Sequence, residues 1–495
     1  MIHTGNPVQI GNRQIITKNN QVMKQKTSST LYRISGILAG GFACTFSLTS
    51  CTPTGETIKP YNFLVIMADD VSPELYGCYG NKKANTPNID KLAENGILFT
   101  TCWAATICSP SRAMIMTGCY ANRTGWYHNA LRVPDKNGET DFLKNHSTFL
   151  TLLRSNGYTT ALAGKWQLPS DINSPEAGID EYSIWEPTIQ YLPEGSVFDG
   201  LKEDEQTLAR YWHPSIVQNG KLINTTVNDF GPDIVVDFLV DFIKRNKEKP
   251  FLAYYPMILP HGTRTGRTTT PLTGKVGDHS NGTFQEDIDY TDVLVGRLIE
   301  TLEKLGLLKN TVIIFTSDNP LPNKNHATNL GATVPLIVHC PDIIKNNHSS
   351  DELISFADIL PTITDLAGVS LPEGYEIDGK SMAPYLHGDS KTHRDWLYSY
   401  VGTAKMIRNK KWVLEAVDPW LESPSGRLYK YDGKDYVKVM DETNEEAAKV
   451  RNYFDSVLSL YPSPDTSDVI VSNILEKYKD YKFRHRLEDS EPLRK

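Results

Sequence analysis

Segments with helical periodicity alternate along the chain with short apolar runs, and this alternation constrains the fold more than any other feature. The clearest unit covers residues 288–319, where an amphipathic pattern stops at Gly306 and a buried apolar run follows. Similar units cover residues 147–166 and 233–261, and an apolar run over 62–68 begins the series. Such continuous runs are typical of strands buried on both faces of a parallel sheet. The sequence therefore predicts an α/β fold with a doubly wound, mainly parallel sheet flanked by helices.

The character of the chain changes after about residue 395. Residues 405–417 and 426–440 alternate and turn as β-hairpins do, and a charged helical segment follows them. We therefore assign residues 61–395 to a main domain. We assign residues 396–495 to a smaller α+β subdomain with an antiparallel sheet, a division for which 495 residues are sufficient.

The first sixty residues are expected to be a targeting segment and a tether. Basic residues precede a weakly apolar run that ends in LTSC, and this ending resembles the lipobox of bacterial lipoproteins. In that class the peptide is cut before the cysteine, which then carries a lipid. We expect a signal peptide over residues 1–50, with Met23 as the true start. A lipid on Cys51 and a polar tether over residues 51–60 would follow.

These features predict an exported bacterial lipoprotein, in the periplasm or at the outer membrane, which contacts the membrane through its lipid. A plain secretory signal or a single membrane span is the alternative. The apolar run is short and rich in Gly, Ser and Thr for a span, which favours the lipoprotein.

The charge balance and the cysteines exclude some classes of protein. The formal net charge is −8 and no dense block of Lys and Arg occurs, which argues against a nucleic-acid partner. Five of the seven cysteines remain when Cys44 and Cys51 are set aside, and no Cys-x-x-Cys pair occurs among them. An odd number with irregular spacing is not typical of a disulfide scaffold, and it leaves at least one thiol for another purpose.

Polar side chains follow two of the apolar runs at the points where they end. Asp69 and Asp70 follow the first run, and Asp318 and Asn319 follow a late one. Acids in such places can be helix caps or ligands of a hard metal. Because carboxyl ends of parallel strands gather at one edge of a sheet, two such pairs favour a metal site. Oxygen donors without a His or Cys cluster favour Ca²⁺ or Mg²⁺ over Zn²⁺.

Two cations, a histidine and a cysteine are expected at the same edge. Lys165 and His261 end two further strand segments, and Lys324 follows the second acidic pair in a polar loop. Each is a weak signal alone, since a lone lysine is usually solvated and a lone histidine is usually structural. Cys108 lies in the segment ICSPSR with Arg112, a setting unlike that of a buried structural cysteine.

The segment CSPSR that begins at Cys108, with Thr117-Gly118 behind it, resembles the signature of the type I sulfatases of the alkaline phosphatase superfamily. Four further segments resemble family motifs and stand in the family's order along the chain: NFLVIMADD before CSPSR, and AGKW, LPH and TSDN after it. Lys324 falls where the family keeps its second lysine, counted back from Val334-Pro335. The resemblance covers about residues 61–390 and implies an alkaline phosphatase-like fold.

The resemblance also implies a mechanism. A maturation enzyme would oxidise Cys108 to formylglycine, whose hydrate carries the attacking hydroxyl. The implied metal ligands for Ca²⁺ or Mg²⁺ are the modified Cys108, Asp69, Asp70, Asp318 and Asn319. Arg112 would hold the attacking hydroxyl, and Lys165 and Lys324 would hold the sulfate. His261 would bind sulfate and protonate the leaving oxygen, and Asp318 would accept a proton when sulfate is expelled. The substrate implied is a sulfate ester, on a sulfated sugar or glycan.

The chain departs from the family pattern in several places. Gln167, which we include among the substrate-binding residues, stands where the family usually has a histidine, and it does not titrate near neutral pH.

Two alternative functions stay open: a phosphodiester or phosphonate monoester hydrolase of the same superfamily, and a glycan-binding lipoprotein with weakened catalysis. Residues 126–128, Arg264 and Arg267 are candidates for a sugar pocket, and ordinary loop positions are an equal alternative.

Overall fold

The computed structural model describes residues 60–477 with internal gaps at 134–140, 169, 186–209, 264–265, 279–280, 419–423 and 466. The predicted signal peptide, Met23, Cys51 and most of the tether lie outside the described residues, and so does Arg264. The predictions about export and lipidation therefore stay predictions.

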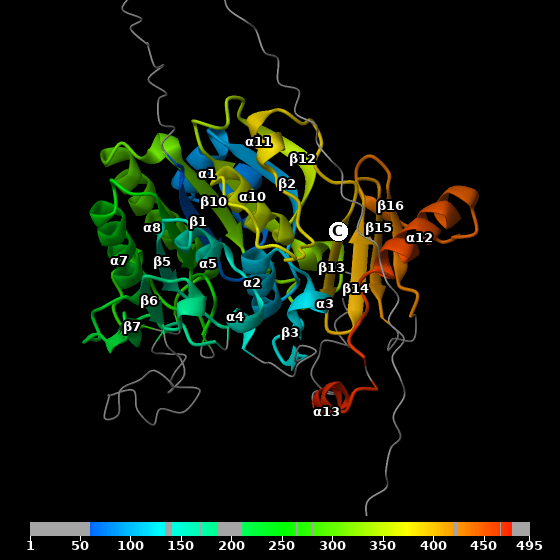
Figure 1. The fold of residues 1–495 in the computed structure, drawn as a ribbon, viewed down its shortest axis with the longest axis horizontal. Coiled ribbons are helices and arrows are strands. Elements are labelled where there is room, and N and C mark those ends of the chain that lie inside the picture. The colour runs from blue at the N-terminus through cyan, green and yellow to red at the C-terminus, as the bar shows by residue number, and fades with distance from the viewer. Residues whose placement is uncertain are drawn as a thin grey trace, which may run out of the picture. The chain divides into compact units, whose positions relative to one another are not determined.

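A ten-stranded mixed sheet forms the centre of the fold (Figure 1), with the order β12-β2-β11-β10-β1-β9-β5-β6-β7-β8. Its strands are β1 (Asn62–Ala68), β2 (Ile97–Trp103), β5 (Thr159–Gly164), β6 (Glu181–Trp185), β7 (Ile216–Gln218), β8 (Lys221–Leu222), β9 (Phe251–Pro256), β10 (Thr311–Ser317), β11 (Thr333–His339) and β12 (His348–Ser355). The central strand β1 pairs in parallel with β9 and β10, and β5 pairs in parallel with β9 and β6. The predicted doubly wound, mainly parallel sheet is confirmed.

Alternate residues of β1 face two different layers of helices. Phe63, Val65 and Met67 belong to one apolar core, and Leu64, Ile66 and Ala68 belong to another. The first core includes residues of α2 (Cys108–Thr117), α5 (Phe149–Arg154) and α10 (Ile359–Leu366). The second includes residues of α1 (Pro87–Glu94), α7 (Gly231–Arg245) and α8 (Phe284–Lys304). A strand buried on both faces has no polar side to alternate, which explains the continuous apolar runs in the sequence.

Strand β11 runs against its neighbours, a detail that the apolar pattern does not reveal. It pairs antiparallel with both β10 and β2. The connection from β10 to β11 contains only the four-residue helix α9 (Asn329–Ala332), which is too short to cross back along the sheet. The chain therefore turns and re-enters the sheet at the edge where β10 ends, and residues 318–332 stay at that edge.

The C-terminal part contains the predicted antiparallel sheet. Its strands are β13 (Leu397–Val401), β14 (Ala404–Arg408), β15 (Trp412–Val417), β16 (Arg427–Tyr431) and β17 (Tyr436–Lys438), paired in that order. Helices α12 (Glu445–Leu458) and α13 (Val469–Lys477) follow. Tyr398, Ile407 and Leu414 belong to the same apolar core as α2 and β1, so the two sheets share buried contacts. The boundary at residue 395 stays a prediction.

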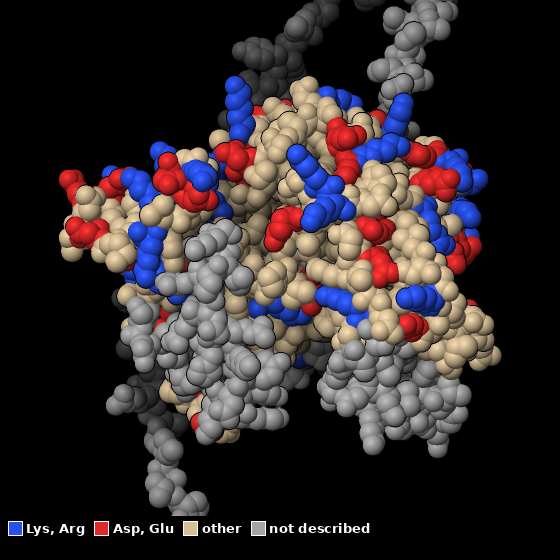
Figure 2. All heavy atoms as spheres, turned by 180° about the vertical axis from the view of Figure 1, so that it is seen from behind, with Lys and Arg blue, Asp and Glu red and all other residues tan. Residues whose placement is uncertain are grey.

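The remaining short elements are α3 (Ala121–Thr124), β3 (Trp126–His128), β4 (Leu131–Arg132), α4 (Phe142–Asn145) and α11 (Ala383–His387). Acidic and basic side chains are interspersed over the face shown in Figure 2, as is common for the surface of a globular domain. Within the described ranges, no helix has the length and apolar character needed to cross a membrane.

Candidate active site

The two acidic pairs meet at the carboxyl ends of β1 and β10. The backbone N–H of Asp69 donates to the Leu259 carbonyl at 3.1 Å, and that of Asp318 donates to the Ala68 carbonyl at 3.0 Å, so backbone bonds fix both positions. Asp70 adopts a left-handed backbone conformation, with φ of 68°, which Asp tolerates better than most residues. Its N–H then donates to Asp318 Oδ1 at 3.1 Å. Two strands far apart in sequence thus present their carboxylates to one point.

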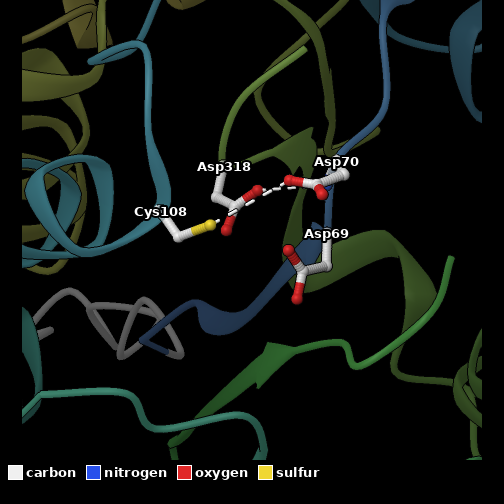
Figure 3. A group of neighbouring side chains, drawn as sticks. All are labelled: Asp69, Asp70, Cys108 and Asp318. Atoms are coloured by element: carbon white, nitrogen blue, oxygen red, sulfur yellow. Dashed lines mark hydrogen bonds between the residues drawn. The ribbon is translucent and has the colours of Figure 1, made fainter. Parts of the chain in front are cut away.

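Cys108 faces these carboxylates from the first position of α2 (Figure 3). One ligand atom from each of Asp69, Asp70, Cys108 and Asp318 lies within 4.8 Å of the others. Cys108 Sγ is 3.9 Å from Asp70 Oδ1 and 3.6 Å from Asn319 Nδ2. Burial raises the pKa of the Cys108 thiol to about 11. The thiol is therefore uncharged, whereas enzymes that attack with cysteine itself use a thiolate.

Three cations surround the carboxylates. Arg112 Nε and Nη2 donate to Asp318 Oδ2 at 3.1 and 2.6 Å, while Nη1 donates to the Lys165 carbonyl at 2.9 Å. Lys165 Nζ donates to Asp69 Oδ2 at 2.6 Å. Lys324 Nζ donates to Asp70 Oδ1 at 2.6 Å and lies 3.1 Å from Cys108 Sγ. The reversal of β11 keeps the loop of Lys324 at this edge.

The cations set the ionisation of the site. Burial alone would raise the pKa of Asp69, but Lys165, His261 and Arg112 hold it well below its ordinary value. Burial alone would lower the pKa of Lys324, but the carboxylates of Asp70 and Asp69 raise it. Asp69 and Lys324 are therefore charged at neutral pH, and the site has a fixed electrostatic field in a dry environment.

His261 approaches the cluster from the loop after β9. Its Nε2 lies 3.6 Å from Asp70 Oδ2. Burial and the neighbouring cations Lys165 and Arg210 together lower the pKa of His261 to about 3, although Asp69 raises it. The imidazole is therefore neutral in this arrangement of charges.

The donor set fits a divalent cation bound by oxygen. Asp69 Oδ1 and Asn319 Oδ1 are buried and have no hydrogen-bond partner in the part of the chain that the structure describes. A buried, unpaired oxygen of this kind is costly unless a ligand completes it. Asp69, Asp318 and Asn319 are fully buried, and no His contributes a ligand atom to the cluster of Asp69, Asp70, Cys108 and Asp318. Oxygen-rich sets of this type suit Ca²⁺ and Mg²⁺.

Gln167 makes no hydrogen bond to Cys108 among the described residues. It follows Lys165 by two positions and has a left-handed backbone, with φ of 57°. Its Oε1 is buried and has no hydrogen-bond partner among the described residues. The structure thus brings together nine of the ten residues singled out from the sequence, and Gln167 is connected to them only through the chain.

The proposed sugar pocket at residues 126–128 is wrong. All three side chains are buried: Tyr127 donates its hydroxyl to the Pro462 carbonyl, and His128 is fully enclosed. The Ala130 N–H donates to His128 Nδ1 at 3.0 Å, and His128 Nε2 lies 3.1 Å from Asn325 Oδ1. His128 thus supports the loop that carries Lys324. Arg267 contacts the Pro260 carbonyl and Asp287.

Three residues that support α2 and His261 are not predicted from the sequence. Asn129 Oδ1 accepts the N–H of Ser109 at 2.9 Å, at the start of α2. The hydroxyl of Tyr211 donates to the carbonyls of Ile258 and His261. Arg210 Nη1 lies 2.7 Å from His261 Nδ1. None of these residues stands in a motif or at a predicted strand end, so the sequence offers no signal that would have found them.

The chain belongs to the sulfatase family, because the family model described as Sulfatase matches residues 61–369. Members of this family are sulfuric ester hydrolases, so the chain is an enzyme of that class. The membership inferred from the five motifs is confirmed.

The chain is similar to several characterised proteins. It is 26% identical over 483 residues to an N-acetylglucosamine-6-O-sulfatase of Bacteroides thetaiotaomicron, across 76% of this chain and 78% of the relative. It is 27% identical over 432 residues to the steryl-sulfatase of Mus musculus, across 70% of this chain and 68% of the relative. The structure of Ps i-CgsB in complex with k-i-k-neocarrahexaose matches with a TM-score of 0.68 and 23% identity. That match covers 86% of this chain and all of the other.

Proposed function

We propose that this sulfatase hydrolyses a sulfate ester on a sulfated sugar or glycan, with a modified Cys108 and a divalent cation, Ca²⁺ or Mg²⁺. The observation that carries the proposal is the convergence of Cys108, three buried carboxylates and three cations at one edge of the sheet. The relatives support the substrate class, since one is an N-acetylglucosamine-6-O-sulfatase and one similar fold holds a neocarrahexaose.

Formylglycine and the divalent cation would supply two kinds of chemistry. Formylglycine, made from Cys108 by a maturation enzyme, would supply as its hydrate one hydroxyl for attack at sulfur and a second whose ionisation releases sulfate. The cation, held by Asp69, Asp70, Asp318 and Asn319, would supply positive charge beside that hydroxyl and the sulfate.

The residues of the chain have distinct parts in this proposal. Lys165 and Lys324 flank the carboxylates and Cys108, where they bind the charged oxygens of the sulfate. Arg112 fixes Asp318 and the Lys165 carbonyl, and it holds the attacking hydroxyl. Asp318 accepts the proton whose loss releases sulfate.

His261 is proposed to act on the leaving oxygen. Its Nε2 faces the carboxylate cluster, so a sulfate bound there brings its bridging oxygen toward that nitrogen. A hydrogen donated from Nε2 offsets the charge that develops as the S–O bond breaks, a contribution typically of about 10²–10⁴ in rate. Gln167 contributes a polar contact with the substrate.

The test is sulfate release from a panel of sulfated mono- and disaccharides, measured by ion chromatography, with aryl sulfate and aryl phosphate beside them. Enzyme made together with a maturation enzyme should release sulfate from at least one sugar. Faster hydrolysis of the phosphate ester would favour the phosphodiester or phosphonate hydrolase, and no hydrolysis of any ester would favour the glycan-binding lipoprotein.

We also propose that the protein is exported and carries a lipid on Cys51, in the periplasm or at the outer membrane. The support is the LTSC sequence after the apolar run. Mass spectrometry of the mature N-terminus should find a lipidated Cys51. A mature protein that begins at another residue and carries no lipid would exclude the anchor.

A further inference from the structure

Arg210 is a buried cation without an ion-pair partner among the described residues. Its side chain is almost fully buried, and its Nε has no hydrogen-bond partner within the described ranges. Its guanidinium lies 4.2 Å from the centre of the Trp185 ring, at the carboxyl end of β6. Stacking on Trp compensates only part of the cost of burying a charge. A further interaction is therefore needed to explain why a charged arginine is buried at this position.

The partner of Arg210 is the imidazole of His261. Arg210 Nη1 lies 2.7 Å from His261 Nδ1 and 3.4 Å from the Gly262 carbonyl. His261 Nδ1 is also 2.7 Å from that carbonyl. A guanidinium is always charged and only donates, so a hydrogen on Nδ1 would oppose it. The stronger, charge-assisted bond requires Nδ1 to accept.

This contact decides which ring nitrogen carries the hydrogen. When Nδ1 accepts, the hydrogen of the neutral ring sits on Nε2, the nitrogen that faces Asp70 and the carboxylate cluster. The backbone of His261 is held independently, since Tyr211 donates to its carbonyl and its own N–H donates to the Ile258 carbonyl at 3.2 Å. The backbone position of His261 and its tautomer therefore depend on different residues.

We propose that Arg210 is a positioning residue of the sulfatase reaction, which holds His261 as the tautomer that donates from Nε2 to the leaving oxygen. This inference rests on the proposed function. As the attacking hydroxyl oxygen bonds to sulfur, the S–O bond to the leaving oxygen breaks and its electron pair stays on that oxygen, which takes the Nε2 proton. The ring takes a proton from water again once the alcohol has left. The guanidinium beside Nδ1 stabilises the negative charge that the ring gains. A neutral imidazole can act as an electrophile in this way.

The test is a double-mutant cycle. Arg210→Met keeps much of the volume and removes the donor, and His261→Ala removes the ring. With a sugar sulfate, Arg210→Met should lower kcat/KM by roughly tenfold to a hundredfold, and with nitrophenyl sulfate by much less. In the His261→Ala background the same change should have little further effect, because Arg210 acts through that ring. An equal loss in both backgrounds would overturn the proposal.

A second measurement reports the tautomer without substrate. The ¹⁵N chemical shifts of His261, assigned by comparison with His261→Ala, should show hydrogen on Nε2 in the wild type. Arg210→Met should shift that distribution toward Nδ1, where the Gly262 carbonyl accepts, and Arg210→Lys should restore part of it. Hydrogen on Nδ1 in the wild type would contradict the proposal even if the enzyme is an active sulfatase.

The two measurements separate the two hypotheses. If no sulfate ester is hydrolysed, the proposed function fails, while the ¹⁵N shifts still decide whether Arg210 sets the tautomer. Arg245→Met, which removes a half-exposed arginine paired with Glu181, is the matched control and should leave both measurements unchanged. If Arg210→Met fails to fold, as judged by circular dichroism, Arg210→Gln takes its place in the cycle.

Discussion

Buried carboxylates lie near both ends of α2, and their surroundings are built differently. At the amino end, beside Cys108, three carboxylates meet three cations, and Asp69 Oδ1 and Asn319 Oδ1 have no hydrogen-bond partner among the described residues. Near the carboxyl end, Gly118 accepts the N–H groups of Asp378 and Gly379, and the neighbouring Lys380 donates its N–H to a single buried carboxylate, Asp358.

Asp358 is fully satisfied by hydrogen bonds. It accepts from the N–H of Ser355 at 2.9 Å, from Lys380 N–H at 2.8 Å, and from the side chains of His393 and Arg394. These donors come from three parts of the chain, at residues 355, 380 and 393–394, so Asp358 connects them. The comparison teaches that a complete cluster stabilises the fold, whereas an incomplete one is prepared for a ligand.

The largest expected effect is at Cys108. Cys108→Ala should reduce sulfate release to background, because it removes the precursor of the nucleophile. The free energy of unfolding should change by only about 1 kcal/mol, since one small side chain is lost. Turnover and chemical denaturation of the same preparation measure both effects.

Mass spectrometry supplies the control for that experiment. A peptide that spans Cys108, from cells with a maturation enzyme, should show the aldehyde or its hydrate in place of the thiol. Fully active protein with an unmodified thiol would disprove the mechanism.

Metal removal should affect only the carboxylates beside Cys108, at the amino end of α2. Chelation should abolish activity, and Ca²⁺ or Mg²⁺ should restore it. Asp69→Ala and Asp318→Ala should cost more activity than Asn319→Ala, because each removes a charge as well as a ligand. Restoration by Zn²⁺ alone would contradict an all-oxygen site.

Asp358→Asn should affect stability and leave the chemistry intact. The change leaves Arg394 buried without its carboxylate, which typically costs about 3–5 kcal/mol. Turnover per folded molecule should stay close to that of the wild type. A fall in turnover without a fall in stability would show that this cluster is not purely structural.

The difference in stability between the wild type and Asp358→Asn should depend on pH. Burial opposes ionisation of Asp358, but Arg394 and His393 lower its pKa to about 2, from an ordinary 3.8. Because the folded-state pKa is the lower one, the carboxylate stabilises the fold above roughly pH 4, and this stabilisation is lost as pH falls toward 2. The unfolding free energies of wild type and Asp358→Asn should therefore converge at acid pH.

The smallest expected effect is at Gln167. Gln167→Ala removes one polar contact and should lower kcat/KM by about tenfold at most. His261→Ala should cost far more on a sugar sulfate, and less on nitrophenyl sulfate, whose leaving group needs no proton. Equal losses for His261→Ala on both substrates would make His261 a sulfate-binding residue only. If Gln167→Ala lowers kcat/KM as much as His261→Ala does, Gln167 has a larger role than one polar contact.

The sequence predicts the sheet and the site edge well, because both follow from local patterns. The apolar run before Asp69 is buried on both faces, as its composition indicates, and its carboxyl end lies beside that of β10. The direction of β11 is not predictable in this way, since an apolar run has no orientation. The short connection through α9 decides it, and a helix of four residues leaves little periodicity to detect.

The contacts behind the site are the part that the sequence does not reveal. Arg210 and His261 are brought together by the sheet order, which places β6 and β9 on either side of β5. His128 illustrates the opposite error, because its aromatic neighbours suggest a binding surface although tertiary packing encloses the ring. Side-chain pairs between distant elements depend on the assembled fold and have no local pattern.

The reversal of β11 also affects how such an enzyme can diversify. Residues 318–332 leave the sheet and return to it at the same edge, with Lys324 between the two anchor points. Such a segment can gain or lose residues without shifting the pairing of β10 or β11, because no crossover has to be spanned. Evolution can therefore reshape residues 320–332 at this edge while the strands and the acids at their ends stay in place.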